Sequence, residues 1–191
     1  MRAFFGLSPN AETTLAIEDW RNKAFPDLHA PVPAANFHVT LAFLGNVSVE
    51  QLDTINYLIE EMPRSIAFNV SLNKLGYWSK PKAFWLGCQQ TANEHLILAK
   101  QVHEIANMSG LLLQQQDYVA HLTLARKCKI KPPAPLVAAN VALCQLLSKR
   151  WLDKLVLIVV WATTAVIASF RFNLWRCLKS GRSLTSRDFA C

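Results

Sequence analysis

The sequence lacks the cysteine patterns of metal-bound and disulfide-linked proteins. It contains no Cys-x-x-Cys pair, and its five cysteines are an odd number. The start of the sequence does not resemble a secretory signal peptide either. We therefore expect free thiols and a cytoplasmic protein, because disulfides persist mainly in oxidising compartments. The cysteines are Cys88, Cys128, Cys144, Cys177 and Cys191.

Histidines at metal-ligand spacing are also missing. His95 and His103 share one face of an expected helix, but two turns separate them, and no thiolate or carboxylate lies between them at ligand spacing. His29 lies among prolines in an expected loop. The sequence therefore predicts no metal site and no other cofactor.

Acidic residues are rare in the C-terminal segment. Residues 1–144 contain 12 Lys and Arg against 11 Asp and Glu, a net charge of +1. Residues 145–191 contain 8 against 2, a net charge of +6. The basic balance belongs to the tail, so it is no evidence that the first 144 residues attract RNA. A local positive potential there stays open.

The longest candidate for a membrane span is slightly short, since an ordinary spanning helix needs about 20 apolar residues. Residues 155–170 are 16 residues without a charge, between Lys154 and Arg171. They could form two buried strands, a membrane-associated helix with basic flanks, or an ending altered by a change of reading frame. We favour the strands or the altered ending and expect no membrane association. Residues 1–145 would form the core, and residues 146–191 an atypical segment that partly completes the fold or is poorly ordered.

One short pattern is present twice. A histidine, an apolar residue, a threonine and an apolar residue occur at residues 38–41 and again at residues 121–124. Each copy lies in an apolar, β-branched stretch that predicts a strand. Because side chains alternate between strand faces, the histidine and threonine of each copy should share one face. In the first copy, Val39, Leu41 and Phe43 should share the other face.

Two such units suit acid and base catalysis on a phosphoryl group. A neutral imidazole can accept a proton from water while a protonated imidazole donates one to the leaving group, near neutral pH and without a metal. The threonine hydroxyls could hold the non-reacting phosphate oxygens. The sequence thus predicts one phosphate site, formed by His38, Thr40, His121 and Thr123.

With these motifs in their settings, the chain resembles the two-histidine (2H) phosphoesterases. Among them it is similar to the bacterial and archaeal RNA 2',3'-cyclic phosphodiesterases, also called 2'-5' RNA ligases. The resemblance rests on four stretches in family order, MRAFFGLSP, NFHVTLAFLGNV, LGYWSKPKAFWLG and DYVAHLTLARK. The ending departs from the family, whose members normally finish with strands that carry a serine, glycine and tyrosine pattern.

The resemblance implies an α+β, bilobal, duplicated fold with two antiparallel sheets, flanked by helices, that face a central cleft. It implies hydrolysis of RNA 2',3'-cyclic phosphodiester ends to 2'-phosphomonoesters, and in some members a reversible 2'-5' RNA ligation. His121 would be the base that activates water, and His38 the acid that protonates the departing 3' oxygen. Thr40 and Thr123 would hold the phosphate. The partner would be RNA with a 2',3'-cyclic phosphate end, tRNA-like or an oligonucleotide, bound by a monomer.

Arg126 is a further candidate for phosphate binding. The family's second motif often has a basic residue there, and a guanidinium suits phosphate oxygens. Strict alternation places Arg126 on the face opposite His121, so it reaches the site only if the strand ends or bulges first. The alternative is a solvated charge at the end of a strand.

Local signals around the motifs predict three helices and three further strands. The helices are expected from an Asn10 cap to about Phe25, from a Ser48 and Gln51 capping box to a point before Pro63, and from a Thr91 and Glu94 capping box to Gly110. The strands are expected at residues 2–7, 66–75 and 83–88, and residues 76–81 should connect the last two.

Four aromatic residues near the motif strands are candidates for stacking on an RNA base, with core packing as the alternative for each. They are Phe37, Tyr77, Trp78 and Trp85. A second functional class also stays open. The chain could be a non-catalytic RNA or nucleotide binder on the same scaffold, inactivated by its atypical C-terminus.

Overall fold

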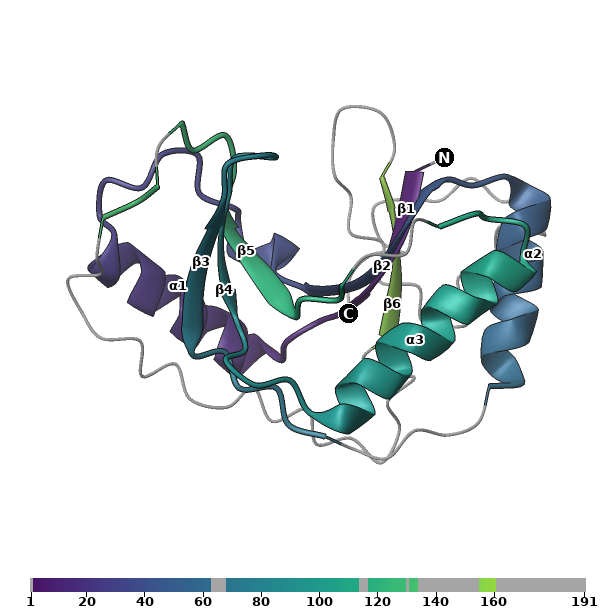
Figure 1. Cartoon of the computed structure of the whole chain (residues 1–191). Coiled ribbons are helices and arrows are strands. Elements are labelled where there is room, and N and C mark those ends of the chain that lie inside the picture. Colours follow the sequence, from purple (N-terminus) through teal and green to yellow (C-terminus); the bar gives the residue numbers. More distant parts are fainter. Residues whose placement is uncertain (1, 63–67, 114–116, 130, 134–154, 161–191) are drawn as a thin grey trace.

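The structure is a computed structural model, and it describes residues 2–62, 68–113, 117–129, 131–133 and 155–160. The order of the elements is β1 (Arg2–Leu7), α1 (Ala11–Ala24), η1 (Ala34–Asn36), β2 (Val39–Asn46), α2 (Val49–Glu60), β3 (Lys74–Trp78), β4 (Ala83–Gly87), α3 (Asn93–Met108), β5 (His121–Ala125) and β6 (Leu155–Val160). Helices separate β1 from β2, β2 from β3 and β4 from β5, whereas β3 and β4 follow one another directly (Figure 1). The α+β class is confirmed.

The described strands form one antiparallel sheet in the order β3-β4-β5-β2-β1-β6. The prediction of two separate sheets is not confirmed, because β2 and β5 join the two sets of strands through the register pair Val39 and Leu122. Figure 1 shows β3, β4 and β5 with α1 on one side of this junction, and β1, β2 and β6 with α2 and α3 on the other.

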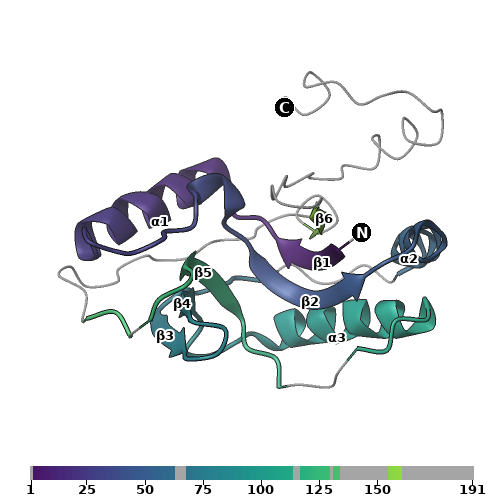
Figure 2. The ribbon, with the colours of Figure 1, turned by 90° about the horizontal axis from the view of Figure 1, so that it is seen from above.

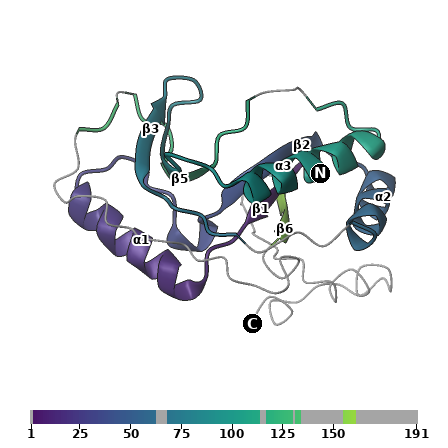
Figure 3. The same ribbon diagram turned by 60° about the horizontal axis from the view of Figure 1, so that its bottom comes forward.

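Each helix that precedes a motif strand packs against the other set of strands. Helix α1, which precedes the first motif, ends against β4, where Phe25 meets Phe84 edge to face at 5.0 Å. Helix α3, which precedes the second motif, packs against β2 instead. Figure 2 shows α1 and α3 on opposite sides of β2, and Figure 3 shows α2 beside the C-terminal end of α3. One hydrophobic core therefore supports both motif strands.

Two of the three predicted helix starts are confirmed. The Asn10 side chain accepts a hydrogen bond from the Thr13 N–H at 2.7 Å. Ser48 and Gln51 form a reciprocal capping box, with bonds of 3.0 and 3.2 Å. The capping box at Thr91 is wrong, because α3 begins at Asn93 and its N-cap is Ala92, without a side-chain cap bond. The chain enters this helix one residue too late for the Thr91 hydroxyl to serve as its cap.

The strand predicted at residues 66–75 is confirmed only at its end, where Lys74 and Leu75 begin β3. Residues 66 and 67 lie outside the described residues. Phe68, Val70 and Leu72 are buried alternately, as in a strand, but from residue 68 to residue 73 there is a bridge at Val70 and no strand. The ladder begins later, where β3 pairs with β4 from Lys74 opposite Gly87 to Trp78 opposite Ala83. The connection is correspondingly shorter and spans residues 79–82. Alternating burial reports contact with the core, which an extended segment can make without pairing.

The C-terminal segment is described only at β6, which pairs antiparallel with β1. This part of residues 155–170 is a strand rather than a helix. Residues 146–154 and 161–191 lie outside the described residues, so the division at residue 145 stays a prediction. No helix in the described ranges is long and apolar enough to cross a membrane. Cys88 and Cys128 are free thiols, and the other three cysteines also lie outside those ranges.

Candidate active site

Each motif histidine makes a hydrogen bond of the same kind to the backbone two residues earlier. His38 directly precedes β2, and His121 is the first residue of β5. In each ring, Nδ1 lies 2.8 Å from the carbonyl oxygen two residues earlier, that of Asn36 or Val119. Because a carbonyl only accepts, Nδ1 carries a proton in both rings. The nitrogen left for proton transfer is Nε2 in both cases.

The register of β2 and β5 gathers the four motif side chains. Val39 pairs with Leu122. One further step of the antiparallel register in each direction puts each motif histidine opposite the threonine of the other copy. Opposite residues share a face, and diagonal neighbours are about 7–8 Å apart between Cα atoms. In this register the two histidines are diagonal neighbours on one face.

Phe43 does not share the buried face, contrary to the prediction. It is 64% exposed, and its ring centroid lies 5.8 Å from that of Phe4. Strand β2 bulges against β1 at Leu41, which has no register partner, so the alternation changes phase before Phe43. The Phe4 ring lies 4.6 Å from the His38 ring. These two phenylalanines therefore flank the site on the side of His38, and sequence periodicity missed them because it assumes an unbroken strand.

Strand β5 both bulges and ends before Arg126, so strict alternation does not keep this residue on the face opposite His121. Strand β5 bulges against β4 at Leu124, and it ends at Ala125. The Arg126 N–H then donates to the Ala30 carbonyl at 3.1 Å, which ties this corner to the loop before the first motif. The exposed guanidinium lies close enough to act on the pKa of both motif histidines.

Burial and positive charge both disfavour the imidazolium forms. Burial lowers the pKa of His38 to about 4, against the bond to the Asn36 carbonyl, and the charges of Arg126 and His121 lower that pKa further. Burial also lowers the pKa of His121, with Arg126 acting in the same direction. His38 is therefore neutral near pH 7 in the free protein. An anionic phosphate between the rings would raise both pKa values again.

Tryptophans line the other side of the site, next to His121. The Trp78 ring lies edge-on to the His121 ring at 4.5 Å, and the Trp85 ring lies at 6.2 Å. Two glycines make room for the Trp85 indole. A Cβ atom would lie 2.0 Å from this ring at Gly76 and 2.7 Å from it at Gly87. The position of the Trp85 ring therefore depends on the absence of a side chain at both glycines. Trp78 packs against Trp85, so its position depends on them indirectly.

The stacking candidates differ in accessibility. Phe37 and Trp85 are 3% and 6% exposed, so they belong to the core. Tyr77 is half-buried, and its hydroxyl donates to the Cys128 carbonyl at 2.8 Å. Trp78 is half-buried beside His121. Of the four, only Trp78 combines contact with a motif histidine and partial exposure.

A buried histidine outside the motifs supports the first motif strand. His95 on α3 is 1% exposed, and its Nε2 lies 2.8 Å from the Tyr118 hydroxyl, which donates to the Thr40 carbonyl at 3.2 Å. A phenol has one proton to donate, so the His95 Nε2–H donates to Tyr118 in this chain of bonds. The sequence shows His95 only as a helical residue, with no signal of this role.

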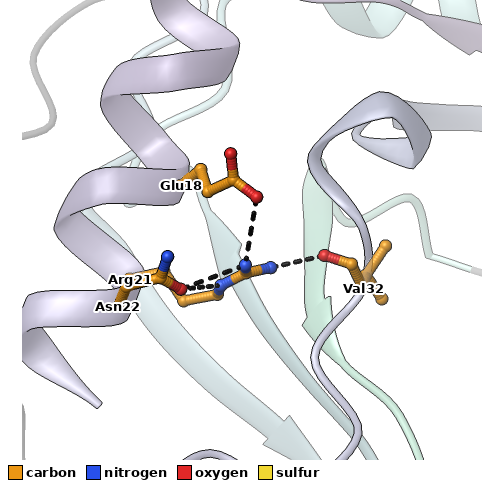
Figure 4. A network of polar contacts seen from close by, with 4 residues as sticks. All are labelled: Glu18, Arg21, Asn22 and Val32. Carbon is orange, nitrogen blue, oxygen red and sulfur yellow. Dashed lines mark hydrogen bonds and ion pairs between the residues drawn. The ribbon is translucent and has the colours of Figure 1, made fainter. Parts of the chain in front are cut away.

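A buried arginine, also unforeseen from the sequence, anchors the loop that leads to the first motif. Arg21 donates to the Val32 carbonyl and to Asn22 and forms an ion pair with Glu18 at 3.6 Å (Figure 4). Its guanidinium also lies 5.3 Å from the ring centroid of Phe37. Helix α1 thus holds the segment that ends at His38.

The site has the chemistry of an anion site. Its polar groups are two imidazoles, two hydroxyls and a guanidinium, which together can accept protons and donate hydrogen bonds to phosphate oxygens. Within the described ranges, no three His, Cys, Asp or Glu side chains form a group that could hold a metal ion.

Comparison with known proteins gives a consistent assignment. Residues 7–85 match the family model described as LigT like Phosphoesterase. The RNA 2',3'-cyclic phosphodiesterase of Escherichia coli is 34% identical over 137 residues, which cover 69% of this chain and 77% of that protein. The protein of the same name from Aquifex aeolicus is 30% identical over 52% of this chain and 54% of its own length. The crystal structure of E. coli LigT in apo form superposes with a TM-score of 0.64 at 33% identity, covering 73% of this chain and 80% of that one. The chain belongs to the LigT-like phosphoesterase family of the 2H superfamily.

Proposed function

We propose that this chain hydrolyses RNA 2',3'-cyclic phosphodiester ends to 2'-phosphomonoesters, with His121 and His38 as base and acid. The observation that carries the proposal is the pairing of the two motif strands, which makes the histidines diagonal neighbours on one face. The names of the E. coli and A. aeolicus relatives support this reaction. A crystal structure of E. coli LigT complexed with 3'-AMP supports a nucleotide substrate.

The proposed step needs two proton transfers. His121 Nε2 accepts a proton from water as the water oxygen bonds to phosphorus, and His38 Nε2–H donates a proton to the 3' oxygen as its bond to phosphorus breaks. The bond from phosphorus to the 2' oxygen is kept. A 5' hydroxyl in place of water would give a 2'-5' linkage by the same transfers.

The remaining site residues would stabilise the charge on phosphorus. The hydroxyls of Thr40 and Thr123 donate to the non-bridging oxygens, and Arg126 offsets their negative charge. The bound phosphate must also raise the pKa of His38 above its value in the free protein, because the acid role requires the imidazolium. We also infer a monomer that acts in the cytoplasm without a metal.

The test is turnover of a nucleoside 2',3'-cyclic phosphate in the presence of EDTA, with the 2'-phosphate as the expected product. His38→Ala and His121→Ala should each lower kcat by about 10²–10⁴-fold. The double variant should lose little more, because the two residues act as one unit. His103→Ala is the matched control, since His103 lies on α3 and contacts Asn107 rather than the site.

Full activity of either single variant would disprove the two-histidine mechanism, and loss of activity with EDTA would disprove the metal-free one. Tight binding of cyclic-ended RNA by the intact chain with no product would instead identify the non-catalytic binder.

A further inference from the structure

We propose that a basic rim beside the catalytic site binds the phosphodiester backbone of the RNA behind its cyclic end. The rim consists of Lys80, Lys82, Lys127 and Lys129. This inference rests on the proposed function, and it extends that function by naming the residues that bind the RNA chain behind the cyclic phosphate.

Two segments far apart in the sequence form the rim. Lys80 and Lys82 lie in the connection between β3 and β4, and the other two lysines follow β5. The Cys128 N–H donates to the Lys82 carbonyl at 3.0 Å, and the Tyr77 hydroxyl donates to the Cys128 carbonyl at 2.8 Å. These bonds hold the two segments together, so four positive side chains start from one corner of the sheet.

The rim has little negative charge of its own. All four lysines are exposed, and the ion pairs among the described residues involve other cations, those of Arg21, Lys23 and Lys100. The sequence contains no Asp or Glu at residues 62–93 or 118–152. Asp27 is an acidic neighbour, since it lines a cavity together with Lys129. A cluster of exposed like charges that takes no part in the ion pairs of the described residues produces a local positive potential that favours a polyanion.

The rim continues directly from the catalytic site. Trp78, which contacts the His121 ring at 4.5 Å, lies two residues before Lys80. Arg126, which lowers the pKa of both motif histidines, directly precedes Lys127. An RNA whose cyclic phosphate lies between the histidines can therefore extend its chain over the rim.

Two of the four lysines have a backbone conformation that is unusual for lysine. Lys82 and Lys127 have φ angles of 65° and 58°, in the left-handed region that favours glycine or asparagine. Both positions nevertheless have long cationic side chains. Flexible ammonium groups suit contacts to successive phosphates that depend on charge and not on base sequence.

The experiment compares two substrates in the full-length chain, a nucleoside 2',3'-cyclic phosphate and a short single-stranded RNA with the same cyclic end. The variant combines Lys80→Gln and Lys129→Gln with Lys82→Asn and Lys127→Asn, because asparagine tolerates a positive φ. For the RNA, kcat/KM should fall by about tenfold or more at low salt, and the log-log slope against salt should become less steep by about 0.7 for each phosphate that is no longer neutralised by a lysine. For the mononucleotide, the change should stay below about threefold, since only the diffuse field is altered.

Lys23→Gln with Lys100→Gln is the matched control, because both lysines are exposed but ion-paired on helices α1 and α3. It should leave the ratio of the two kcat/KM values unchanged. An unaltered ratio in the rim variant, or equal losses on both substrates, would overturn the rim as an RNA site. Absence of turnover of either substrate by the unmodified chain would instead count against the proposed function, so the two failures are distinguishable.

Discussion

Val39 and Leu122 are register partners, and they are the pair that joins β2 to β5. Each directly follows its motif histidine, and both side chains are buried in the common core. A packed apolar pair on the face away from the site therefore fixes the register that places the two motif histidines as diagonal neighbours. The proposed two-histidine mechanism therefore depends on side chains outside the site.

Removing either motif hydroxyl should slow catalysis without unfolding the protein. Thr40→Val and Thr123→Val keep the shape of the side chain, and each should lower kcat by about 10²–10³-fold if the hydroxyl donates to the transition state. Thr→Ser at the same positions should retain most of the activity. Unchanged kcat in both valine variants would remove the threonines from the site, and kcat at saturating cyclic phosphate is the quantity to measure.

Removing the charge of Arg126 should move the pH profile upward. The guanidinium lowers the pKa of both motif histidines, so both pKa values should rise in Arg126→Gln. The base must then be deprotonated at a higher pH, and the acid stays protonated to a higher pH. A pH series of kcat/KM tests this, with Lys100→Gln as the control. A profile that falls in height but does not shift would show that Arg126 acts on the substrate alone.

His95 should make the protein less stable in mild acid. Burial lowers its pKa from 6.5 to about 4, so the unfolded chain binds the proton first as the pH falls. The stabilisation is present above pH 6.5 and is lost between about pH 6.5 and 4, with a limit of about 3 kcal/mol for this group.

His95→Gln tests this origin of the acid sensitivity, because the amide can still donate to Tyr118 but does not titrate. The free energy of unfolding of this variant should fall less over the same pH range. Part of the fall should remain, since the pKa of His38 is lowered in the same way. An identical pH dependence in the two proteins would contradict the prediction.

A side chain at Gly76 should disturb the site from a distance. In Gly76→Ala, the new Cβ would lie 2.0 Å from the Trp85 ring, so the indole must move. Trp85 packs against Trp78 at 5.0 Å, and Trp78 contacts His121. Both stability and kcat should fall, whereas Gly45→Ala, at a position with no atom within 4 Å of a new Cβ, should lower stability only through its positive φ. Thermal unfolding and turnover distinguish the two cases.

Local signals were sufficient for much of the fold. The Asn10 cap and the Ser48 capping box each involve residues three positions apart, so the sequence contains all their partners. The same reasoning failed at Thr91, where a cap was possible but the chain entered the helix one residue later. It also failed at Phe43, because a bulge depends on the partner strand and not on the strand's own periodicity.

The sequence by itself determined the two motifs, their family and the imidazole and hydroxyl pair on each strand, because side-chain chemistry and strand alternation act over a few residues. Only the tertiary structure decided that the motif strands meet at Val39 and Leu122, that Arg126 lies near both histidines, and that four lysines from two segments share one corner. Those relationships arise from strand register, bulges and long-range hydrogen bonds, which depend on pairing between segments distant in the chain.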